Sequence, residues 1–324
     1  MKDSAPEISV VVPLLNEEES LPELVGLIDA EIQNMGLAYE VILVDDGSTD
    51  SSWAVIQSLQ TKYPQVRGVK FQRNYGKSAA LNVGFHRARG SVVITMDADL
   101  QDRPSEIPEL YRLIKVEKFD LISGYKQVRH DPLSKTIPTK LFNWATRQLS
   151  GIHNLHDFNC GLKAYRKEVV KSIEVYGEMH RYIPFLAKGA GFRKIGEKIV
   201  EHHPRKFGTT KFGMERFING FLDLLSLSFV LKFGRRPMHF FGTIGTLSFF
   251  LGFLITFWVI SEKLYKIYKQ YPADEIRPVV DQPLFYLALT AVVIGAQLFL
   301  AGFLGELISR NAPGRNDYLI ETEL

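Results

Sequence analysis

The sequence has a single cysteine and almost no net charge. Cys160 is the only cysteine in 324 residues, so an intramolecular disulfide is impossible, and we expect no zinc site built from thiolates. The formal charge of +3 at pH 7 is too small to indicate nucleic-acid binding. Hydrophobic residues make up 46% of the chain and charged residues 23%, a balance that excludes a disordered protein. We expect Cys160 to be a small buried residue.

The start of the chain also lacks an export signal. The first apolar run, residues 8–12, is too short for the core of a signal peptide, and Pro13 follows it at once. We therefore expect the large N-terminal region to stay in the cytoplasm.

Two long stretches contain no Lys, Arg, Asp or Glu. Residues 237–261 form one stretch of 25 residues, and residues 282–305 form another of 24. Each exceeds the roughly 20 residues that cross a bilayer core as a helix. The flanking basic residues are nearly balanced, so the positive-inside rule does not fix the orientation. The predicted organisation is a domain over 1–211, an amphipathic juxtamembrane helix over 212–236, transmembrane helices over 237–261 and 282–308, a loop over 262–281 and a cytoplasmic tail over 309–324.

The first 125 residues alternate between apolar β-branched runs and helical patterns. This order predicts an α/β fold, in which a mostly parallel sheet carries helices on both faces and the crossovers are right-handed. Further along, the pattern favours a loop over 126–138, helices over 165–176 and 180–188, and a strand over 192–201. The predicted strands of the first part are 8–12, 40–44, 66–71, 92–95 and 120–124, and the predicted helices are 17–34, 51–63, 78–88 and 110–116.

Two acidic side chains follow the strand predicted over 92–95. Asp97 and Asp99 are one residue apart, at the point where that strand ends. Ligands of open α/β sheets bind outside the carboxyl ends of the strands. Two carboxylates placed there can reach one hard divalent cation that is shared with phosphates. The alternative is a pair of solvated loop aspartates.

The other strand ends carry polar groups that suit a sugar nucleotide. Asn16 and Glu17 follow the first strand, and Asp45 and Asp46 follow the second. Carboxylates and an asparagine can hydrogen-bond a base and a ribose, and Lys77, which precedes the third helix together with Arg73, can neutralise phosphate. The Asp-Gly-Ser sequence at 46–48 could by itself be only a turn.

Four motifs together resemble glycosyltransferase family 2. They are VVPLLNEE at 11–18, VDDGSTD at 44–50, NYGKSAALNVG at 74–84 and DADLQD at 97–102. More narrowly, the chain resembles the polyprenyl-phosphate glycosyltransferases over about residues 7–310, including bactoprenol-phosphate glucosyltransferases and dolichol-phosphate mannose synthases. The resemblance implies a GT-A fold, a nucleotide-sugar donor, Mg²⁺ or Mn²⁺, and a lipid phosphate acceptor at the cytoplasmic face of a bacterial inner membrane.

The resemblance also implies roles for particular residues. Asp157, in the segment DFNCGLKAYR at 157–166, matches the candidate catalytic aspartate. The basic segment RKFGTTK at 205–211 matches a phosphate-binding loop, with Thr210 where relatives often carry Ser. The implied catalytic residues are Asp157 and Asp99; the nucleotide-sugar site is Pro13, Leu15, Asn16, Glu17, Asp45, Asp46, Lys77, Asp97 and Ala98; the metal ligands are Asp97, Asp99 and Gln101; and the acceptor-phosphate site is Arg129, Arg205 and Lys211.

Other readings of these residues stay open. Asp157 could be a helix N-cap or a salt-bridge partner, and Arg205 and Lys211 could contact membrane lipid. An acceptor phosphate monoester is already largely anionic at neutral pH. We therefore expect Asp157 to orient groups, or to deprotonate the protonated fraction of acceptor, in a single inverting displacement.

The expected reaction moves a sugar, with glucose or a related hexose first, from a UDP-linked donor to undecaprenyl phosphate. UDP is preferred because bacterial relatives with two spans mostly use it. The alternatives are a GDP-mannose-dependent enzyme like the dolichol-phosphate mannose synthases, a family 2 enzyme with another lipid or glycan acceptor, and a non-catalytic membrane scaffold. Polymerising relatives carry a Gln-x-x-Arg-Trp motif, which this sequence lacks. Relatives suggest a tetramer, and no nucleic-acid partner is expected.

Overall fold

A computed structural model describes residues 5–127, 143–144, 146–201, 229, 237–272, 275–310 and 320–323. The chain divides into two compact units. One unit contains the N-terminal region together with the last residues of the chain, and the other spans Ser226–Arg315.

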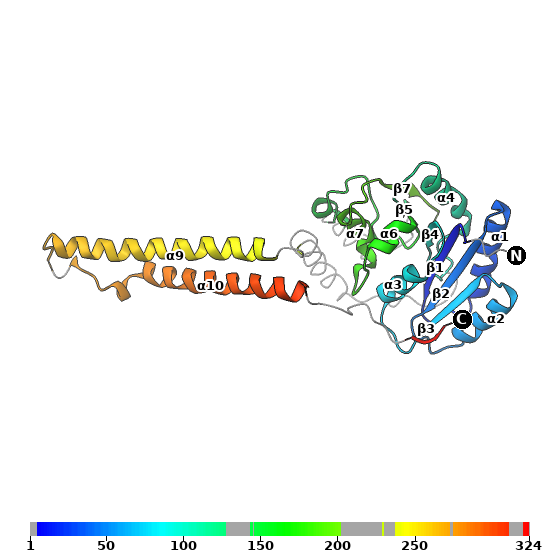
Figure 1. Cartoon of the computed structure of the whole chain (residues 1–324), viewed down its shortest axis with the longest axis horizontal. Helices are drawn as coiled ribbons and strands as arrows, with labels where there is room; N and C mark the ends of the chain where they lie inside the picture. Colours follow the sequence, from blue (N-terminus) through cyan, green and yellow to red (C-terminus); the bar gives the residue numbers. More distant parts are fainter. Residues whose placement is uncertain are drawn as a thin grey trace. The chain divides into compact units, whose positions relative to one another are not determined.

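The first unit is built on one sheet, whose described part has eight strands in the order β7-β5-β6-β4-β1-β2-β3-β8 (Figure 1). Strands β1 to β4 are parallel to one another, and β7 is parallel to β5. Strand β6 lies antiparallel between β4 and β5, and β8 is antiparallel to β3. The strands are β1 (Ile8–Leu14), β2 (Tyr39–Asp45), β3 (Val66–Phe71), β4 (Val92–Thr95), β5 (Leu121–Tyr125), β6 (Lys163–Arg166), β7 (Ile195–Ile199) and β8 (Ile320–Glu323).

Helices cover both faces of this sheet, as the alternating pattern predicted. Every residue of β1 is buried, which is typical of a parallel strand with helices above and below it. Val10 packs in the core that includes Ile28 of α1, while Val11 faces α3, where a Cβ on Gly84 would meet its side chain. The helices are α1 (Leu21–Met35), α2 (Ser52–Lys62), α3 (Lys77–Arg87), α4 (Ile107–Lys115), α6 (Lys167–Ser172) and α7 (Ile183–Gly189), with short 3-10 turns η1 (Pro104–Glu106) and η2 (Met179–Tyr182).

One predicted helix was partly wrong. The helical pattern over 165–176 begins, in the structure, with strand β6, and α6 starts only at Lys167. Residues 163–166 pair with β4 on one side and with β5 on the other. Hydrogen bonds to two strands distant in sequence override the local helical preference.

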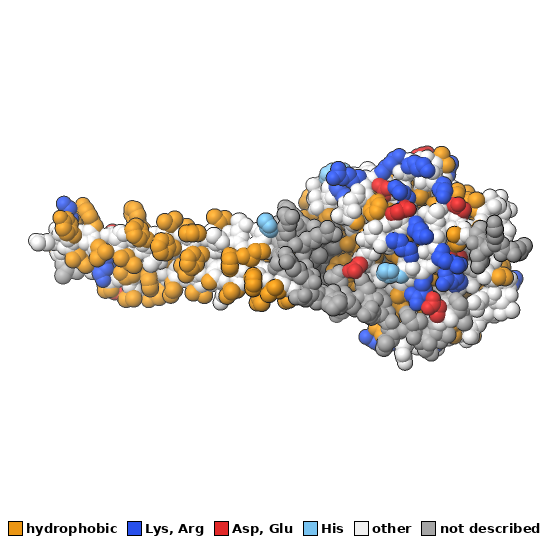
Figure 2. All heavy atoms as spheres, viewed as in Figure 1, with side chains coloured by type: hydrophobic (Ala, Val, Ile, Leu, Met, Phe, Trp, Pro, Cys, Tyr) orange, Lys and Arg blue, Asp and Glu red, His pale blue; other side chains and the backbone are white. Residues whose placement is uncertain are grey.

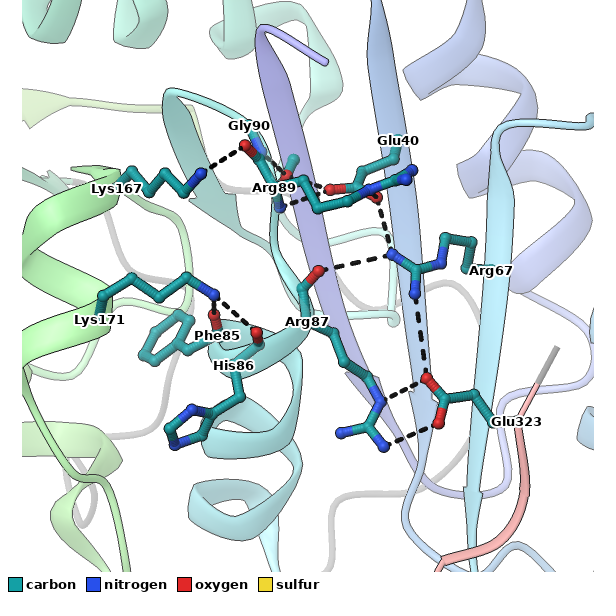
Figure 3. A network of polar contacts seen from close by, with 11 residues as sticks. Glu40, Arg67, Phe85, His86, Arg87, Arg89, Gly90, Lys167, Lys171 and Glu323 are labelled. Carbon is teal, nitrogen blue, oxygen red and sulfur yellow. Dashed lines mark hydrogen bonds and ion pairs between the residues drawn. The ribbon is translucent and has the colours of Figure 1, made fainter. Parts of the chain in front are cut away.

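Strand β8 belongs to the region predicted as a cytoplasmic tail. It pairs with the outer edge of β3, and Glu323 makes two hydrogen bonds with the guanidinium of Arg87, at 2.7 and 2.9 Å (Figure 3). Arg67 extends the network, because its Nη1 lies 3.0 Å from Oε2 of the buried Glu40. Arg89 also contacts Glu40, with Nε 3.0 Å from the same oxygen. A charged strand thus covers a sheet edge that would otherwise expose unpaired backbone groups.

The second unit contains two long apolar helices, α9 (Pro237–Tyr268) and α10 (Pro283–Arg310), with the short turn η4 (Val279–Asp281) before α10. Their segments Met238–Tyr268 and Pro283–Gly305 are long and apolar enough to cross a membrane. Helix α9 continues past residue 261, the predicted end of the first span. Large apolar side chains such as Phe253 and Trp258 are exposed, and Figure 2 shows hydrophobic side chains along both helices. A soluble protein rarely exposes so many, and both helices suit a hydrocarbon environment.

Small residues bring α9 and α10 together. A Cβ on Gly245 would stand 2.6 Å from the carbonyl oxygen of Gly295, and the reverse distance is also 2.6 Å. The Ser248 hydroxyl donates to the carbonyl of Ala291 at 2.8 Å. Close backbone approach through glycine is a usual way for helices to associate in a membrane.

Candidate active site

Asp97 emerges two residues after the end of β4 and is paired with a lysine. Lys77 Nζ lies 2.5 Å from Asp97 Oδ1, and about a third of each side chain is exposed, 33% and 31%. Burial raises the pKa of Asp97, but the ammonium groups of Lys77, Lys126 and Lys163 outweigh it and lower the pKa to about 2. Asp97 is therefore a carboxylate at neutral pH, at the sheet edge where the sequence placed it.

Asp97, Asp99 and Gln101 belong to the turn that follows β4, which we call the acidic turn (residues 97–101). Leu100, between Asp99 and Gln101, has a φ of 61°, and the Gln101 N–H donates to Asp99 Oδ1 at 3.2 Å. Both residues are half-buried, whereas Ala98 is buried. In the described part of the chain, no three His, Cys, Asp or Glu side chains gather into a group that could hold a metal ion. Two carboxylates with hard oxygen donors nevertheless fit Mg²⁺ or Mn²⁺ that takes its remaining ligands from phosphates and water.

The loops after β1 and β2 are cross-linked to each other. Pro13 is buried within β1, Leu15 is half-buried and Asn16 is exposed, with a φ of 57°. The Asn16 N–H donates to Ser48 Oγ, and Asn16 Oδ1 accepts from the Thr49 N–H, each at 2.9 Å. These bonds join the loop after β1 to the loop after β2, and together the two loops form a polar surface, here called the polar wall, beside the strand ends.

The Glu17 backbone adds a further link to that wall. Its N–H donates to Ser52 Oγ at 2.9 Å. Ser52 is the first residue of α2, so the loop after β1 is tied to the helix that follows β2.

The two neighbouring acids at the end of β2, Asp45 and Asp46, have different surroundings. Asp45 is fully buried, and its Oδ1 accepts from the Ser48 N–H at 2.8 Å. Within the described residues its Oδ2 is buried without a hydrogen-bond partner, and burial raises its pKa. A buried unpaired oxygen is unfavourable unless a ligand uses it.

Asp46 holds the loop that precedes α3. Its carboxylate accepts from the Tyr75 N–H at 2.7 Å and from the Gly76 N–H at 2.9 Å. Gly47 has a φ of 76° and lies so close to this loop that a Cβ would stand 2.5 Å from the carbonyl carbon of Arg73. Burial raises the pKa of Asp46 in spite of these bonds. Asp46 thus positions the start of α3, and with it the side chain of Lys77.

The segment that begins at Asp157 packs against the acidic turn. Asp157 is buried, and its Oδ1 accepts from the Asn159 N–H at 3.0 Å. Its own N–H donates to Glu197 Oε1 at 2.9 Å. Thr95 Oγ1 donates to the Gly161 carbonyl at 2.9 Å. Asp157 therefore closes a two-residue side-chain turn rather than capping a helix.

Gly161 lies very close to the Asp97 side chain. A Cβ at this position would stand 2.5 Å from the Asp97 carboxylate. The structure thus brings a segment some sixty residues further along the chain into contact with Asp97, because β6 lies beside β4.

Two lysines, the half-buried Lys126 and the buried Lys163, belong to the site and were not predicted. Lys126, placed by the sequence in a loop, lies with its Nζ 2.8 Å from Oδ1 of the buried Asp102. Burial lowers the pKa of Lys126, but the Asp102 carboxylate, together with Cys160 and Asp97, outweighs burial and raises it. Lys163 is buried and donates to the Cys160 carbonyl, and its pKa is lowered mainly by burial. In the sequence, Lys163 lies within the segment 157–166 that begins at Asp157, whereas Lys126 carries no comparable signal.

The start of α3 has a second anchor. The His180 N–H donates to Ser78 Oγ at 3.0 Å, and His180 Nδ1 lies 3.0 Å from the same hydroxyl. Cys160 is buried, as expected. The predicted acceptor-phosphate residues Arg129, Arg205 and Lys211 lie outside the described residues, as does nearly all of the predicted helix over 212–236.

Residues 9–174 match the family model described as Glycosyl transferase family 2. The chain belongs to this family. It is 34% identical over 307 residues to a dodecaprenyl-phosphate galacturonate synthase of Rhizobium johnstonii, covering 94% of this chain and 88% of the relative. It is also 34% identical over 305 residues to an undecaprenyl-phosphate 4-deoxy-4-formamido-L-arabinose transferase of Shewanella sediminis, covering 94% and 87%.

Solved structures agree with the fold of this glycosyltransferase. Glucosyl-3-phosphoglycerate synthase of Mycobacterium tuberculosis superposes with a TM-score of 0.52 at 20% identity, over 70% of this chain and 80% of that one. Mannosyl-3-phosphoglycerate synthase of Rubrobacter xylanophilus gives 0.54 at 15% identity, over 69% and 74%. The GT-A fold and the glycosyltransferase class implied by the sequence motifs are confirmed. The matched region contains both the acidic turn and Asp157.

Proposed function

We propose that this glycosyltransferase moves a sugar from a nucleotide-sugar, UDP-linked by preference, to a polyprenyl phosphate such as undecaprenyl phosphate. The product is a polyprenyl-monophosphate sugar for the cell envelope, made at the cytoplasmic face of the inner membrane. The observation that carries the proposal is the contact between the acidic turn and the Asp157 segment at the carboxyl edge of the sheet. Relatives that match along nearly their whole length are named for dodecaprenyl and undecaprenyl phosphate.

The donor would lie along the cross-linked loops after β1 and β2. Asn16 and the unpaired oxygen of Asp45 offer acceptors for the nucleoside. Asp97 and Asp99, with the side-chain oxygen of Gln101, would hold Mg²⁺ or Mn²⁺ next to the diphosphate. A cation there neutralises charge on the leaving nucleoside diphosphate.

The acceptor needs charge balance more than deprotonation. Its phosphate is mostly dianionic at neutral pH, so the buried Asp157 would orient the Cys160–Gly161 backbone and the acceptor rather than act as an essential base. The in-line attack of a phosphate oxygen predicts inversion at the sugar carbon. Arg129, Arg205 and Lys211 are proposed to bind the acceptor phosphate.

The two apolar helices support a lipid acceptor. Drawing an isoprenoid chain into water would expose many apolar groups, at about 0.8 kcal/mol for each CH₂ equivalent. An enzyme that is anchored in the bilayer can meet the phosphate at headgroup level while the tail stays in hydrocarbon.

The test uses full-length protein in detergent or nanodiscs. UDP- and GDP-linked sugars, including uronic acid and amino-arabinose forms, are offered with undecaprenyl phosphate and Mg²⁺ or Mn²⁺, and the lipid product is identified by mass spectrometry. We expect transfer from at least one UDP-sugar and inversion at its anomeric carbon. Transfer only from GDP-mannose would replace the preferred donor. Transfer only to a non-phosphorylated acceptor would overturn the proposal.

A variant pair sharpens this assay. Asp99→Asn removes one carboxylate of the acidic turn, and we expect a loss of at least about 100-fold in kcat, as for other groups that stabilise charge in a transition state. Asp281→Asn, an exposed position in η4 of the other unit, is the matched control and should leave transfer unchanged. Full activity of Asp99→Asn would contradict the assignment of Asp99.

A further inference from the structure

Three lysines in the described part of the chain act on Asp97, and of these only Lys77 has a side chain that can move away from it. Its side chain is 33% exposed. Lys126 is 13% exposed and is tied to Asp102, and Lys163 is buried and bonded to the Cys160 carbonyl. Within the described residues, the Lys77 ammonium has no hydrogen bond or ion pair other than the one with Asp97.

The backbone beneath Lys77 is held firmly, so the movement is confined to its side chain. On one side Asp46 binds the N–H groups of Tyr75 and Gly76. On the other side Ser78 binds His180. A lysine side chain has a flexible four-carbon stem that ends in a compact charge. Its ammonium can therefore move from Asp97 to another anion nearby while α3 stays in place.

The charges around Asp97 oppose a divalent cation that arrives alone. Three acids, Asp97, Asp102 and Asp157, and three lysines, Lys77, Lys126 and Lys163, are linked by electrostatic interactions in this region. Asp99 adds a fourth acid, two residues from Asp97 in the acidic turn. Together the formal charges of these acids and lysines leave one net negative charge. A divalent cation alone would make the region net positive, whereas a cation that enters with a nucleoside-diphosphate sugar, which carries two negative charges, restores the original balance. Like charges a few ångströms apart in a half-buried site repel strongly.

We propose that Lys77 is a placeholder cation: it occupies Asp97 while no donor is bound, and it moves to the donor's diphosphate when the divalent cation and the donor enter together. This inference rests on the proposed nucleotide-sugar donor. It assigns Lys77 two successive partners, Asp97 and then a phosphate, and it makes Lys77 a residue that discourages binding of the cation without its donor.

The test measures binding rather than turnover. Full-length protein in detergent is titrated with Mn²⁺ in the absence of nucleotide, with free Mn²⁺ followed by electron paramagnetic resonance, and then with UDP in the presence of Mn²⁺ by calorimetry. The variants are Lys77→Met, Lys77→Gln and Lys77→Arg. Lys62→Met, at an exposed position of α2, is the control for loss of one positive charge.

Removing the charge should change the two affinities in opposite directions. In Lys77→Met and Lys77→Gln we expect Mn²⁺ alone to bind at least about 5-fold more tightly, because the competing ammonium is gone, and UDP with Mn²⁺ to bind at least about 5-fold more weakly. Lys77→Arg should stay near wild type for Mn²⁺ alone. A merely structural role would weaken both affinities. Thermal unfolding should stay near wild type, since the pair is partly exposed.

The outcomes separate this inference from the proposed function. Unchanged or weaker Mn²⁺ binding in both neutral variants would overturn the placeholder role, even if the wild-type enzyme transfers sugar to polyprenyl phosphate. Opposite shifts in the two affinities would support it, even if the acceptor proves to be another molecule. Should one neutral variant fail to fold, the other decides.

Discussion

The half-buried Lys126 and the buried Asp102 form an ion pair, with Nζ 2.8 Å from Oδ1 and side chains 13% and 0% exposed. The pair joins the end of β5 to the loop that follows the acidic turn. Asp102 is only three residues from Asp99, so this contact fixes where the acidic turn lies against the rest of the sheet.

Breaking this pair should destabilise the enzyme. Lys126→Met leaves a carboxylate buried without its partner, and we expect the free energy of unfolding to fall by about 3–5 kcal/mol. The measurement is chemical unfolding of the full-length protein in detergent. The double variant Lys126→Met/Asp102→Asn removes the orphaned charge and should recover a large part of the loss. A single variant as stable as wild type would show that the pair contributes nothing.

Gly161→Ala should impair donor binding while the fold persists. The added methyl group would stand 2.5 Å from the Asp97 carboxylate, and a flexible carboxylate can move aside more easily than backbone. We expect at least a 10-fold rise in the Kd for UDP with Mn²⁺, because Asp97 is displaced, and a small change in melting temperature. Gly26→Ala is the control, since the nearest atom to its Cβ, Tyr63 Oη, is 3.7 Å away. Unchanged UDP affinity in Gly161→Ala would contradict this arrangement.

Asp45→Asn should raise the stability of the protein and weaken its binding of UDP. The Oδ2 atom of Asp45 is buried without a partner within the described residues, and burial raises its pKa above the ordinary 3.8. Above about pH 4 the native state then holds more protons than the unfolded state, so the contribution of Asp45 to stability falls as pH rises through the raised pKa. An asparagine at this position carries no charge, so its contribution to stability does not fall as the pH rises.

We therefore expect Asp45→Asn to melt at a higher temperature than wild type, with a larger difference at pH 7 than at pH 4. UDP should bind at least about 10-fold more weakly if the unpaired oxygen accepts from the base. Calorimetric unfolding and UDP titration give the two readouts, with Asp281→Asn as control. A variant that is less stable at pH 7 would refute the expected penalty of the buried charge.

Glu40 and Glu323 belong to one network but should differ in their contributions to stability. The Glu323 side chain is 43% exposed, so Glu323→Ala should lower the free energy of unfolding by about 0.2–1 kcal/mol. The Glu40 side chain is 2% exposed and binds Ser9, Arg67 and Arg89. Glu40→Ala should lower it by at least about 2 kcal/mol, because hydrogen bonds to a buried charge are lost together. Equal effects of the two substitutions would show that burial does not decide them.

Much of the fold could be predicted from local pattern. The strands around Val10, Leu43 and Ile94 are short β-branched runs between helical segments, and such runs form the buried strands of a parallel sheet. Because parallel strands end at one edge, Asp45, Asp97 and the loop after Pro13 had to gather there. The short strand β6 and the C-terminal strand β8 could not be predicted, since each exists through hydrogen bonds to strands far away in the chain.

The sequence by itself determined the chemistry available to this protein: acids at the strand ends, lysines in the same region and two long stretches without charged residues. Composition and short-range periodicity are local properties, so they can be read without the fold. Only the tertiary structure decided which charges meet. Insertion of β6 between β4 and β5 places Gly161 against Asp97 and buries Lys163 nearby, and the end of β5 brings Lys126 to Asp102. Such pairs depend on strand order, and strand order is set by burial and hydrogen bonding across the whole sheet.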